Sequence, residues 1–179
     1  MRIIDISERI TDGMSVYEGD PPVKMQPWAS IDIDGFGVTR MELGTHTGTH
    51  IDAPVHYYKD GKRADELDLE AFFGECEVTR EPLKSDCKRI ITLEKCEMDA
   101  QTAKKLIEKG VKLIGTSLLS IGGDEVHRIL LAGGCAILEN LRLEGIAPEK
   151  YFLTCAPLKI SADGSPVRAC LIEGIKETI

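Results

Sequence analysis

The stretch His46-Thr-Gly-Thr-His50-Ile-Asp52-Ala-Pro-Val-His56 is the most informative part of this chain. It holds three of the four histidines in 179 residues and places a carboxylate between the second and the third. Imidazole and carboxylate side chains together suit divalent zinc, manganese or iron, and the lack of cysteine in the stretch argues against a closed structural zinc site. The stretch is therefore predicted to form a metal site.

The local sequence favours an extended backbone here. Gly48, Pro54 and the β-branched threonines at positions 45, 47 and 49 disfavour a helix, and an extended chain sends alternate residues to one face. Residues 46, 50, 52 and 56 would then share a side, and Gly48 would allow the ribbon to bend. The alternative is that each histidine is separately satisfied by a backbone carbonyl, which does not explain three of them at even spacing beside an aspartate.

Length and composition bound the rest of the interpretation. A chain of 179 residues predicts one domain spanning 1–179, large enough to fold without a disulfide or a metal. A net charge of −8 argues against nucleic acid or a membrane surface as partner, so a small-molecule substrate is expected. There is no apolar run that could span a bilayer, and the six scattered cysteines are expected to be reduced, so we expect a cytoplasmic protein.

Short alternating or apolar runs predict a mixed α/β domain with more strand than helix. The expected strands cover residues 2–6, 38–43, 111–115, 135–141, 151–160 and 166–172. Helices are expected at 99–109 with Asp99 as N-cap, at 125–132 after an N-cap at Asp124, and at 66–73. The segment Asp163-Gly-Ser-Pro166 is expected to be a hairpin loop, with Gly164 in the left-handed conformation.

The fourth histidine and one carboxylate are further candidates for the site. His127 falls in the first turn of the helix expected after Asp124, where the helix dipole disfavours a protonated imidazole. Glu139 interrupts the apolar run 135–141, and a carboxylate that points inward there needs a partner such as a metal ion. Spacing alone is equally compatible with a Glu139 that faces solvent and a His127 with no ligand role.

These residues resemble the cyclase family, which includes bacterial kynurenine formamidases and isatin hydrolases. The stretch 43–56 is similar to the family's H-x-G-T-H-x-D-x-P-x-H signature. The likeness continues, in the same order along the chain, through residues 56–61, 67–74, 126–131, 138–141, 156–159 and 163–169.

The resemblance implies a swivelling β/β/α fold, in which mixed sheets form a barrel-like core with few helices, and a homodimer or higher homo-oligomer. It also implies a site for one or two divalent ions, with zinc typical of the formamidases and manganese of the isatin hydrolases. The residues that match the family's site are His46, His50 and Asp52 for the first metal, Asp52, His127 and Glu139 for the second, and His56 as catalytic acid/base.

The activity implied by the resemblance is metal-dependent hydrolysis of an amide C–N bond by a metal-activated water. The substrate would be N-formylkynurenine, a related aryl formamide or a cyclic amide. Formamidases usually carry Trp-Pro-Gly-Asp near the amino terminus, whereas this chain has Tyr17-Glu-Gly-Asp20. Tyr17 is therefore the candidate substrate contact, and N-formylkynurenine itself is left open. The only tryptophan, Trp28, is expected in packing or at an interface.

The alternative is a non-hydrolytic cyclase or dehydratase, or a metal-binding module of the same fold. His56 favours hydrolysis, because a module that only binds metal has no need for a histidine just beyond the ligands.

Overall fold

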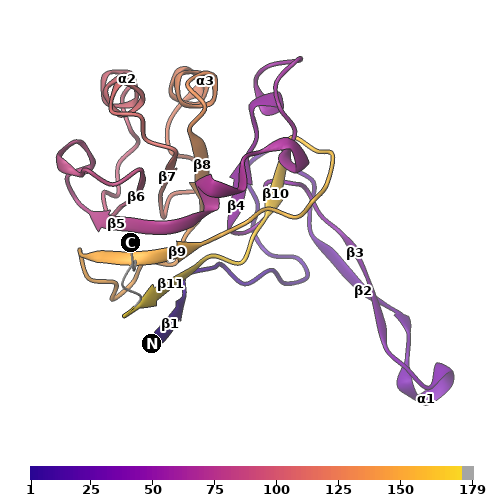
Figure 1. Cartoon of the computed structure of the whole chain (residues 1–179). Helices are drawn as coiled ribbons and strands as arrows, with labels where there is room; N and C mark the ends of the chain where they lie inside the picture. Colours follow the sequence, from indigo (N-terminus) through magenta and orange to yellow (C-terminus); the bar gives the residue numbers. More distant parts are fainter. Residues whose placement is uncertain (175–179) are drawn as a thin grey trace.

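One curled sheet forms the body of the protein in the computed structural model, which describes residues 1–174 (Figure 1). Within these residues nine strands join in the order β1-β11-β9-β5-β6-β7-β8-β4-β10. Strands β5 to β8 are mutually parallel, and the pairs on either side of them are antiparallel. The strand bounds are β1 Arg2–Asp5, β4 His50–Asp52, β5 Phe73–Thr79, β6 Arg89–Thr92, β7 Leu113–Gly115, β8 Ala136–Glu139, β9 Lys150–Thr154, β10 Gly164–Pro166 and β11 Cys170–Glu173.

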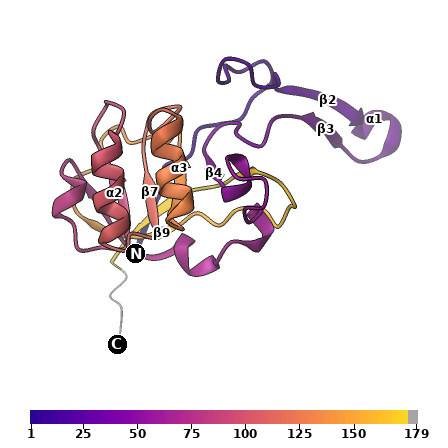
Figure 2. The same cartoon turned by 90° about the horizontal axis from the view of Figure 1, so that it is seen from above.

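Two amphipathic helices cover one face of the parallel strands (Figure 2). Helix α2 (Ala100–Glu108) connects β6 to β7, and α3 (Asp124–Ala132) connects β7 to β8. The expected start of α2 is confirmed, because the Asp99 carboxylate accepts a hydrogen bond from the Thr102 N–H at 2.7 Å. The helices bury their apolar sides against the sheet, in a cluster that includes Leu106, Leu130, Ile90, Ile114 and Ile137.

A second apolar cluster fills the concave face of the sheet. It includes Ile6, Ile51, Phe72, Leu138 and Leu153, each no more than 2% exposed. Because the sheet is covered on both faces, β6, β7 and β8 consist almost entirely of buried residues. The expected mixed α/β architecture, with more strand than helix, is confirmed.

Several expected boundaries are wrong for identifiable reasons. The N-cap of α3 is Gly123, and Asp124 is the first helical residue. Residues 66–73 form no α-helix: two 3-10 turns, η2 (Ala64–Glu66) and η3 (Leu69–Phe72), are separated by extended Leu67 and Asp68, and Phe73 begins β5. The strand expected at 151–160 ends at Thr154, shortly before Pro157, which has no N–H to donate.

The expected hairpin loop at 163–166 is also wrong. Gly164–Pro166 is itself strand β10, which pairs antiparallel with β4 along the edge of the sheet. Gly164 does not have the left-handed backbone that was expected, since it is absent from the positive-φ glycines of the described chain. Its small size instead allows the His46 ring to pack closely against it.

A two-stranded ribbon projects away from this body (Figures 1 and 2). Strands β2 (Lys24–Ala29) and β3 (Val38–Glu42) pair antiparallel and are joined by the short helix α1 (Ile31–Asp34). We call residues 24–42 the arm. The strand expected at 38–43 is confirmed as β3, whereas its partner β2 was not predicted.

Two further 3-10 turns are η1 (Pro54–His56) and η4 (Pro82–Lys84). No helix in the described part of the chain has the length and apolar character needed to cross a membrane.

Candidate metal centre

Strand β4 supplies the middle of the site because of where it lies in the sheet. It runs between β8 and β10, and its register places His50 opposite Glu139 and Asp52 opposite Gly164. His50 and Asp52 are two residues apart on a strand, so their side chains point to the same face. Both are nearly inaccessible, at 4% and 1% exposure, which places an imidazole and a carboxylate together inside the protein.

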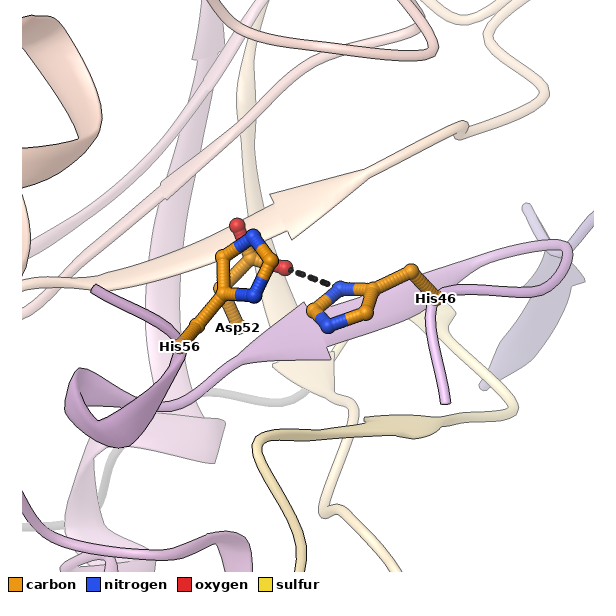
Figure 3. A group of neighbouring side chains, drawn as sticks. All are labelled: His46, Asp52 and His56. Atoms are coloured by element: carbon orange, nitrogen blue, oxygen red, sulfur yellow. Dashed lines mark hydrogen bonds and ion pairs between the residues drawn. The ribbon is translucent and has the colours of Figure 1, made fainter. Parts of the chain in front are cut away.

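His46 and His56 reach the same place by different routes. His46 lies in a turn before β4, in which Gly48 has a φ of 64°, and His56 ends the 3-10 turn η1. The expected extended backbone therefore holds for β4 but not for the whole stretch. The imidazoles nevertheless converge: the His46 ring lies 4.1 Å from that of His56 and 5.1 Å from that of His50, centroid to centroid. Figure 3 shows the His46 imidazole hydrogen-bonded to a carboxylate oxygen of Asp52, with the His56 ring beside both.

Helix α3 and strand β8 bring in the two residues whose role the spacing left open. His127 Nε2 lies 3.2 Å from Glu139 Oε1 and 3.5 Å from Asp52 Oδ2. Both side chains point inward, at 4% and 3% exposure, so a Glu139 that faces solvent is ruled out.

Backbone carbonyls orient two of the imidazoles. His50 Nδ1 lies 2.8 Å from the Gly48 carbonyl oxygen, and His127 Nδ1 lies 3.2 Å from that of Gly123. An N–H at Nδ1 can donate to each carbonyl, which leaves Nε2 facing the carboxylates. This is the outer hydrogen bond that usually fixes the tautomer and ring orientation of a metal-binding histidine.

The donor atoms form two groups that share Asp52. Ligand atoms of His46, Asp52 and His56 lie within 4.8 Å of one another, and so do those of His50, Asp52 and Glu139. This division differs from the one that the family resemblance implied, in which His50 stood with His46, and His127 with Glu139. The chemistry of the donors, imidazole nitrogen and carboxylate oxygen, fits a divalent cation of borderline softness.

The imidazoles and carboxylates of this centre shift one another's pKa values. Burial alone would lower the pKa of His50, but hydrogen bonds to Asp52 and Glu139 and their charges raise it to about 10. Burial alone would raise the pKa of Asp52, but hydrogen bonds to His46 and His50 hold it well below its usual range. Metal ligands must lose such protons, so a cation and these protons would compete for the same atoms.

The carboxylates also override the helix dipole at His127. Burial lowers the pKa of this imidazole, but the hydrogen bond to Glu139 and the charges of Glu139 and Asp52 outweigh that effect and raise it. The carboxylates thus shift the pKa of His127 in the direction opposite to the one expected from the amino end of α3.

His56 differs from the other imidazoles. Its side chain is 31% exposed, and burial together with the charge of His46 lowers its pKa, against smaller opposite effects of Asp52 and Asp163. His56 is thus the neutral histidine of the cluster near pH 7, the form that can accept a proton.

Asp163 belongs to the site although sequence reasoning missed it. Thr45 Oγ1 donates to Asp163 Oδ1 at 2.8 Å, and Asp163 Oδ2 lies 3.1 Å from His46 Nε2 and 3.5 Å from His56 Nδ1. The following residue must be small, because a Cβ on Gly164 would lie 2.7 Å from His46 Cε1. The pair Asp163-Gly164 was interpreted as part of a turn, whereas the Asp163 carboxylate lies against the imidazoles of His46 and His56.

The centre opens into a cavity of about 420 Å³. Its wall includes the segment 15–20 with Tyr17, which is 54% exposed, and the apolar side chain of Leu119. Tyr57 stacks on His127 with centroids 5.3 Å apart, and its hydroxyl donates to Asp124 at 3.1 Å. Tyr17 therefore lies where a substrate contact is expected, and Tyr57 adds an aromatic face that the sequence did not single out.

The cysteines lie elsewhere. All six fall in the described part of the chain and are unpaired, and the wall of this cavity contains no cysteine of residues 1–174. Burial raises the pKa of the Cys135 thiol to about 12. Nothing in the geometry supports a catalytic thiolate.

Fold and site together define an α/β protein with a buried imidazole and carboxylate centre of the kind that holds divalent cations. The Cyclase family model, described as "Putative cyclase", matches residues 4–97, more than half of the chain. A relative named kynurenine formamidase, from Geobacillus thermodenitrificans, is 32% identical over 94% of this chain and 96% of its own length. The chain therefore belongs to the cyclase family, as the resemblance indicated.

Solved structures show the same fold. A predicted metal-dependent hydrolase from Bacillus stearothermophilus is 25% identical, covers 95% of this chain and 97% of its own, and superposes with a TM-score of 0.79. Isatin hydrolase A from Labrenzia aggregata, bound to benzyl benzoate, is 21% identical, with 97% and 94% coverage and a TM-score of 0.80. These similarities confirm the fold expected for the family.

Proposed function

We propose that this chain is a metal-dependent hydrolase that cleaves the amide C–N bond of a small aryl formamide or a related cyclic amide. The observation that carries the proposal is the half-buried His56 imidazole beside a buried set of imidazole and carboxylate donors, in the wall of a cavity of about 420 Å³. Full-length similarity to a kynurenine formamidase supports the choice of an amide bond.

The buried imidazoles and carboxylates would form the metal-binding site. His46, His50, Asp52, His127 and Glu139 would hold one or two divalent cations, with zinc as the first candidate and manganese as the second. When bound, such a cation lowers the pKa of a coordinated water and polarises the amide carbonyl.

Proton transfer falls to His56. As a neutral imidazole it accepts a proton from the attacking water and returns that proton to the leaving nitrogen, which departs as an amine. Asp163 Oδ2 beside His56 Nδ1 favours the tautomer that carries its proton at Nδ1 and leaves Nε2 as the base. A positioned acid/base of this kind contributes roughly 10²–10⁴-fold to the rate.

The cavity wall suits an aromatic substrate. Tyr17 and Tyr57 offer flat faces and Leu119 an apolar edge, so we place the aryl ring of the substrate against the segment 15–20. A small-molecule substrate, rather than nucleic acid or a membrane, agrees with the net charge of −8. A cytoplasmic location is part of this proposal and is supported by the six unpaired cysteines.

The test combines metal content with turnover. The purified protein is analysed by plasma mass spectrometry, stripped with a chelator, and reconstituted with zinc or manganese. Hydrolysis of N-formylkynurenine and simple aryl formamides is followed at each stage. Turnover that disappears on chelation and returns with one metal supports the proposal. Bound metal without hydrolysis of any of these amides would contradict the hydrolase and favour a non-hydrolytic member of the family. A protein that binds no divalent metal even after reconstitution would contradict the site itself.

A further inference from the structure

A second cavity lies at the carboxyl ends of the parallel strands, apart from the metal centre. Strands β6, β7 and β8 lie side by side, with α2 and α3 over one face (Figure 1). Glu139 of the metal centre ends β8. Thr92 ends β6 and Thr116 follows β7, and these two threonines line a cavity of about 370 Å³. Ligands of open α/β sheets bind outside the carboxyl ends of the strands, so a ligand is expected at this position as well.

The two cavities are separate. Their walls share no residue of the described chain, and the loop after β7 runs between them. Ser120 and Gly122 line the metal cavity, while Ile121, which lies between them, lines the second cavity. The wall of the second cavity includes none of the candidate metal ligands. A molecule bound there would therefore occupy a site of its own.

Two buried hydroxyls face each other across neighbouring strands in this wall. Thr92 is 5% exposed and Thr116 is 1% exposed. The register of β6 and β7 pairs Ile91 with Gly115, so Thr92 and Thr116 are neighbours one residue further along. Adjacent strands lie about 4.8 Å apart, a spacing at which one ligand oxygen can reach both hydroxyls.

The hydrogen-bonding state of these hydroxyls leaves both of their protons free. Each Oγ1 accepts a hydrogen bond at 3.1 Å from the backbone N–H two residues later, that of Glu94 for Thr92 and that of Leu118 for Thr116. Within residues 1–174 neither hydroxyl has an acceptor for its own proton. A buried donor without an acceptor is costly, so both donors need an oxygen supplied from outside the chain.

Apolar side chains make up much of the remaining wall. Leu83 comes from η4, Met98 from the residue before the α2 cap, and Ile121 from the loop after β7. Methionine adapts to irregular shapes and makes favourable contacts with aromatic rings. An apolar cavity of about 300–1,000 Å³ with a few convergent polar groups is the usual form of a small-molecule site. The wall therefore suits a single aromatic ring.

Charge decides which acceptor oxygen fits. The wall includes the carboxylates of Glu94, Glu97 and Asp99. Lys84, its only cation among the described residues, is already paired with Glu81. These carboxylates repel a ligand whose acceptor is an anionic oxygen. A neutral carbonyl oxygen avoids this repulsion, and its two lone pairs can accept from both threonines.

We propose that this second cavity binds a small neutral molecule with one aromatic ring and a carbonyl oxygen. The oxygen accepts hydrogen bonds from Thr92 and Thr116, and the ring packs against Leu83, Met98 and Ile121. This site lies outside the metal cavity, so the proposal does not rest on the hydrolase function.

Met98 can report occupancy directly. It is the only one of the five methionines, all of which lie in residues 1–174, that lines this cavity, and none of them lines the metal cavity. The full-length protein, stripped of metal by a chelator and labelled with ¹³C at the methionine methyl groups, is titrated with acetophenone and followed by NMR. We expect a saturable shift of the Met98 signal with a Kd in the millimolar range or below. Benzoate, which has the same ring and a charged carboxylate, should bind at least about 10-fold more weakly.

Valine substitutions test the two hydroxyls. Thr92→Val and Thr116→Val keep the shape of the side chain and remove the donor, so each should weaken acetophenone binding about 3–10-fold with an unchanged circular dichroism spectrum. Thr79→Val is the matched control. Thr79 ends β5 outside the cavity, and its Oγ1 accepts from the backbone N–H of Glu81 in the same way. Acetophenone should bind this control as it binds the wild type.

Several outcomes would overturn the proposal. A Met98 signal that does not shift, or shifts without saturation, would show that the cavity holds only water. Benzoate that binds as tightly as acetophenone would contradict the preference for a neutral ligand. Full affinity in either valine variant of the cavity would contradict the hydrogen bonds to the ligand. An equal loss in Thr79→Val would assign the effect to the local backbone instead of the hydroxyl donors.

Discussion

Without a bound cation, the stability of this protein should depend on the proton that His50 carries. The perturbation is a rise in pH from 6.5 to 8 in the presence of a chelator. Asp52 and Glu139 raise the pKa of His50 in the folded protein to about 10, from its ordinary value of 6.5. A group whose pKa is raised by folding adds stability that is complete below its unfolded pKa and is lost as the pH rises toward its folded pKa. The metal-free protein should therefore lose stability across this range.

The size of the effect follows from the shift. Moving the pKa from 6.5 to about 10 corresponds to about 5 kcal/mol of folding free energy at full effect. His50 is only 4% exposed, so solvent screening removes little of this. By linkage, roughly 2 kcal/mol should be lost between pH 6.5 and pH 8. His46 and His127 also have raised pKa values, so they add to the loss in the same direction.

Urea unfolding at a series of pH values measures the effect, since the free energy of unfolding follows from each transition. The series stops at pH 8 because burial raises the pKa of the Cys76, Cys135 and Cys155 thiols, and their ionisation in the unfolded chain would add a separate loss above that pH. The matched variant is His50→Gln, which removes the main titrating group and should reduce the slope to the part that His46 and His127 contribute.

The metal-loaded protein provides the opposite case. Imidazoles bind a cation only when deprotonated at the ligand atom, so metal binding strengthens as the pH rises and should offset the loss. If the free energy of unfolding of the metal-free protein stays constant or increases from pH 6.5 to 8, the coupling between His50 and the two carboxylates is wrong. A full slope in His50→Gln would show that other groups cause it.

Four substitutions test the separate parts of the site. His56→Ala should keep its metal and lose roughly 10²–10⁴-fold in turnover. Asp52→Ala should lose its metal, because Asp52 belongs to both donor groups. Metal content and kcat are measured for both variants, and loss of metal in His56→Ala would make His56 a ligand. Asp163→Asn should retain metal, reduce kcat about 10–100-fold and shift the pH profile of kcat. An unchanged pH profile would contradict the contact between Asp163 and His56. Gly164→Ala should lower the free energy of unfolding, measured in urea, by about 1–3 kcal/mol, because the added Cβ would lie 2.7 Å from His46 Cε1. A variant as stable as the wild type would show that the imidazole can move aside.

Part of the site could be read from the sequence because it depends on strand periodicity. His50 and Asp52 stand two apart on β4, so their convergence follows from local geometry. His46 and His56 also reach the centre, but through a turn at Gly48 and a 3-10 turn after Pro54, which a periodic pattern does not describe. The spacing thus predicted the right residues with only part of the right backbone.

The remaining members of the site depend on long-range pairing. Glu139 lies opposite His50 only because β8 pairs with β4, and Asp163 reaches His46 only because β10 pairs with the other edge of β4. Neither pairing follows from the local sequence of one strand. At Asp163 the local sequence was misleading. The pair Asp-Gly is favoured in turns, but here the glycine is needed because the His46 ring packs against it.

The arm was half visible in the sequence. The alternation at 38–43 predicted a strand, but Pro27 and the irregular pairing around Trp28 concealed its partner. Trp28 was expected to pack inside the protein or to lie at an interface. Within the described chain it is 71% exposed, so it does not pack in the core. A large aromatic side chain exposed to this degree is typical of an interaction surface.

Arm and metal centre are physically connected, so a contact that orders the arm should also influence metal binding. The same chain segment that leaves the cavity at Asp20 enters β2, and the segment that leaves β3 at Glu42 reaches His46 four residues later. Any contact that holds the arm in place therefore also restrains the backbone on both sides of the cavity mouth. Restraining ligands before binding lowers the entropy that binding must overcome. A contact made at Ile33, which lies at the far end of the arm from every ligand, should therefore change the affinity of the site for its cation.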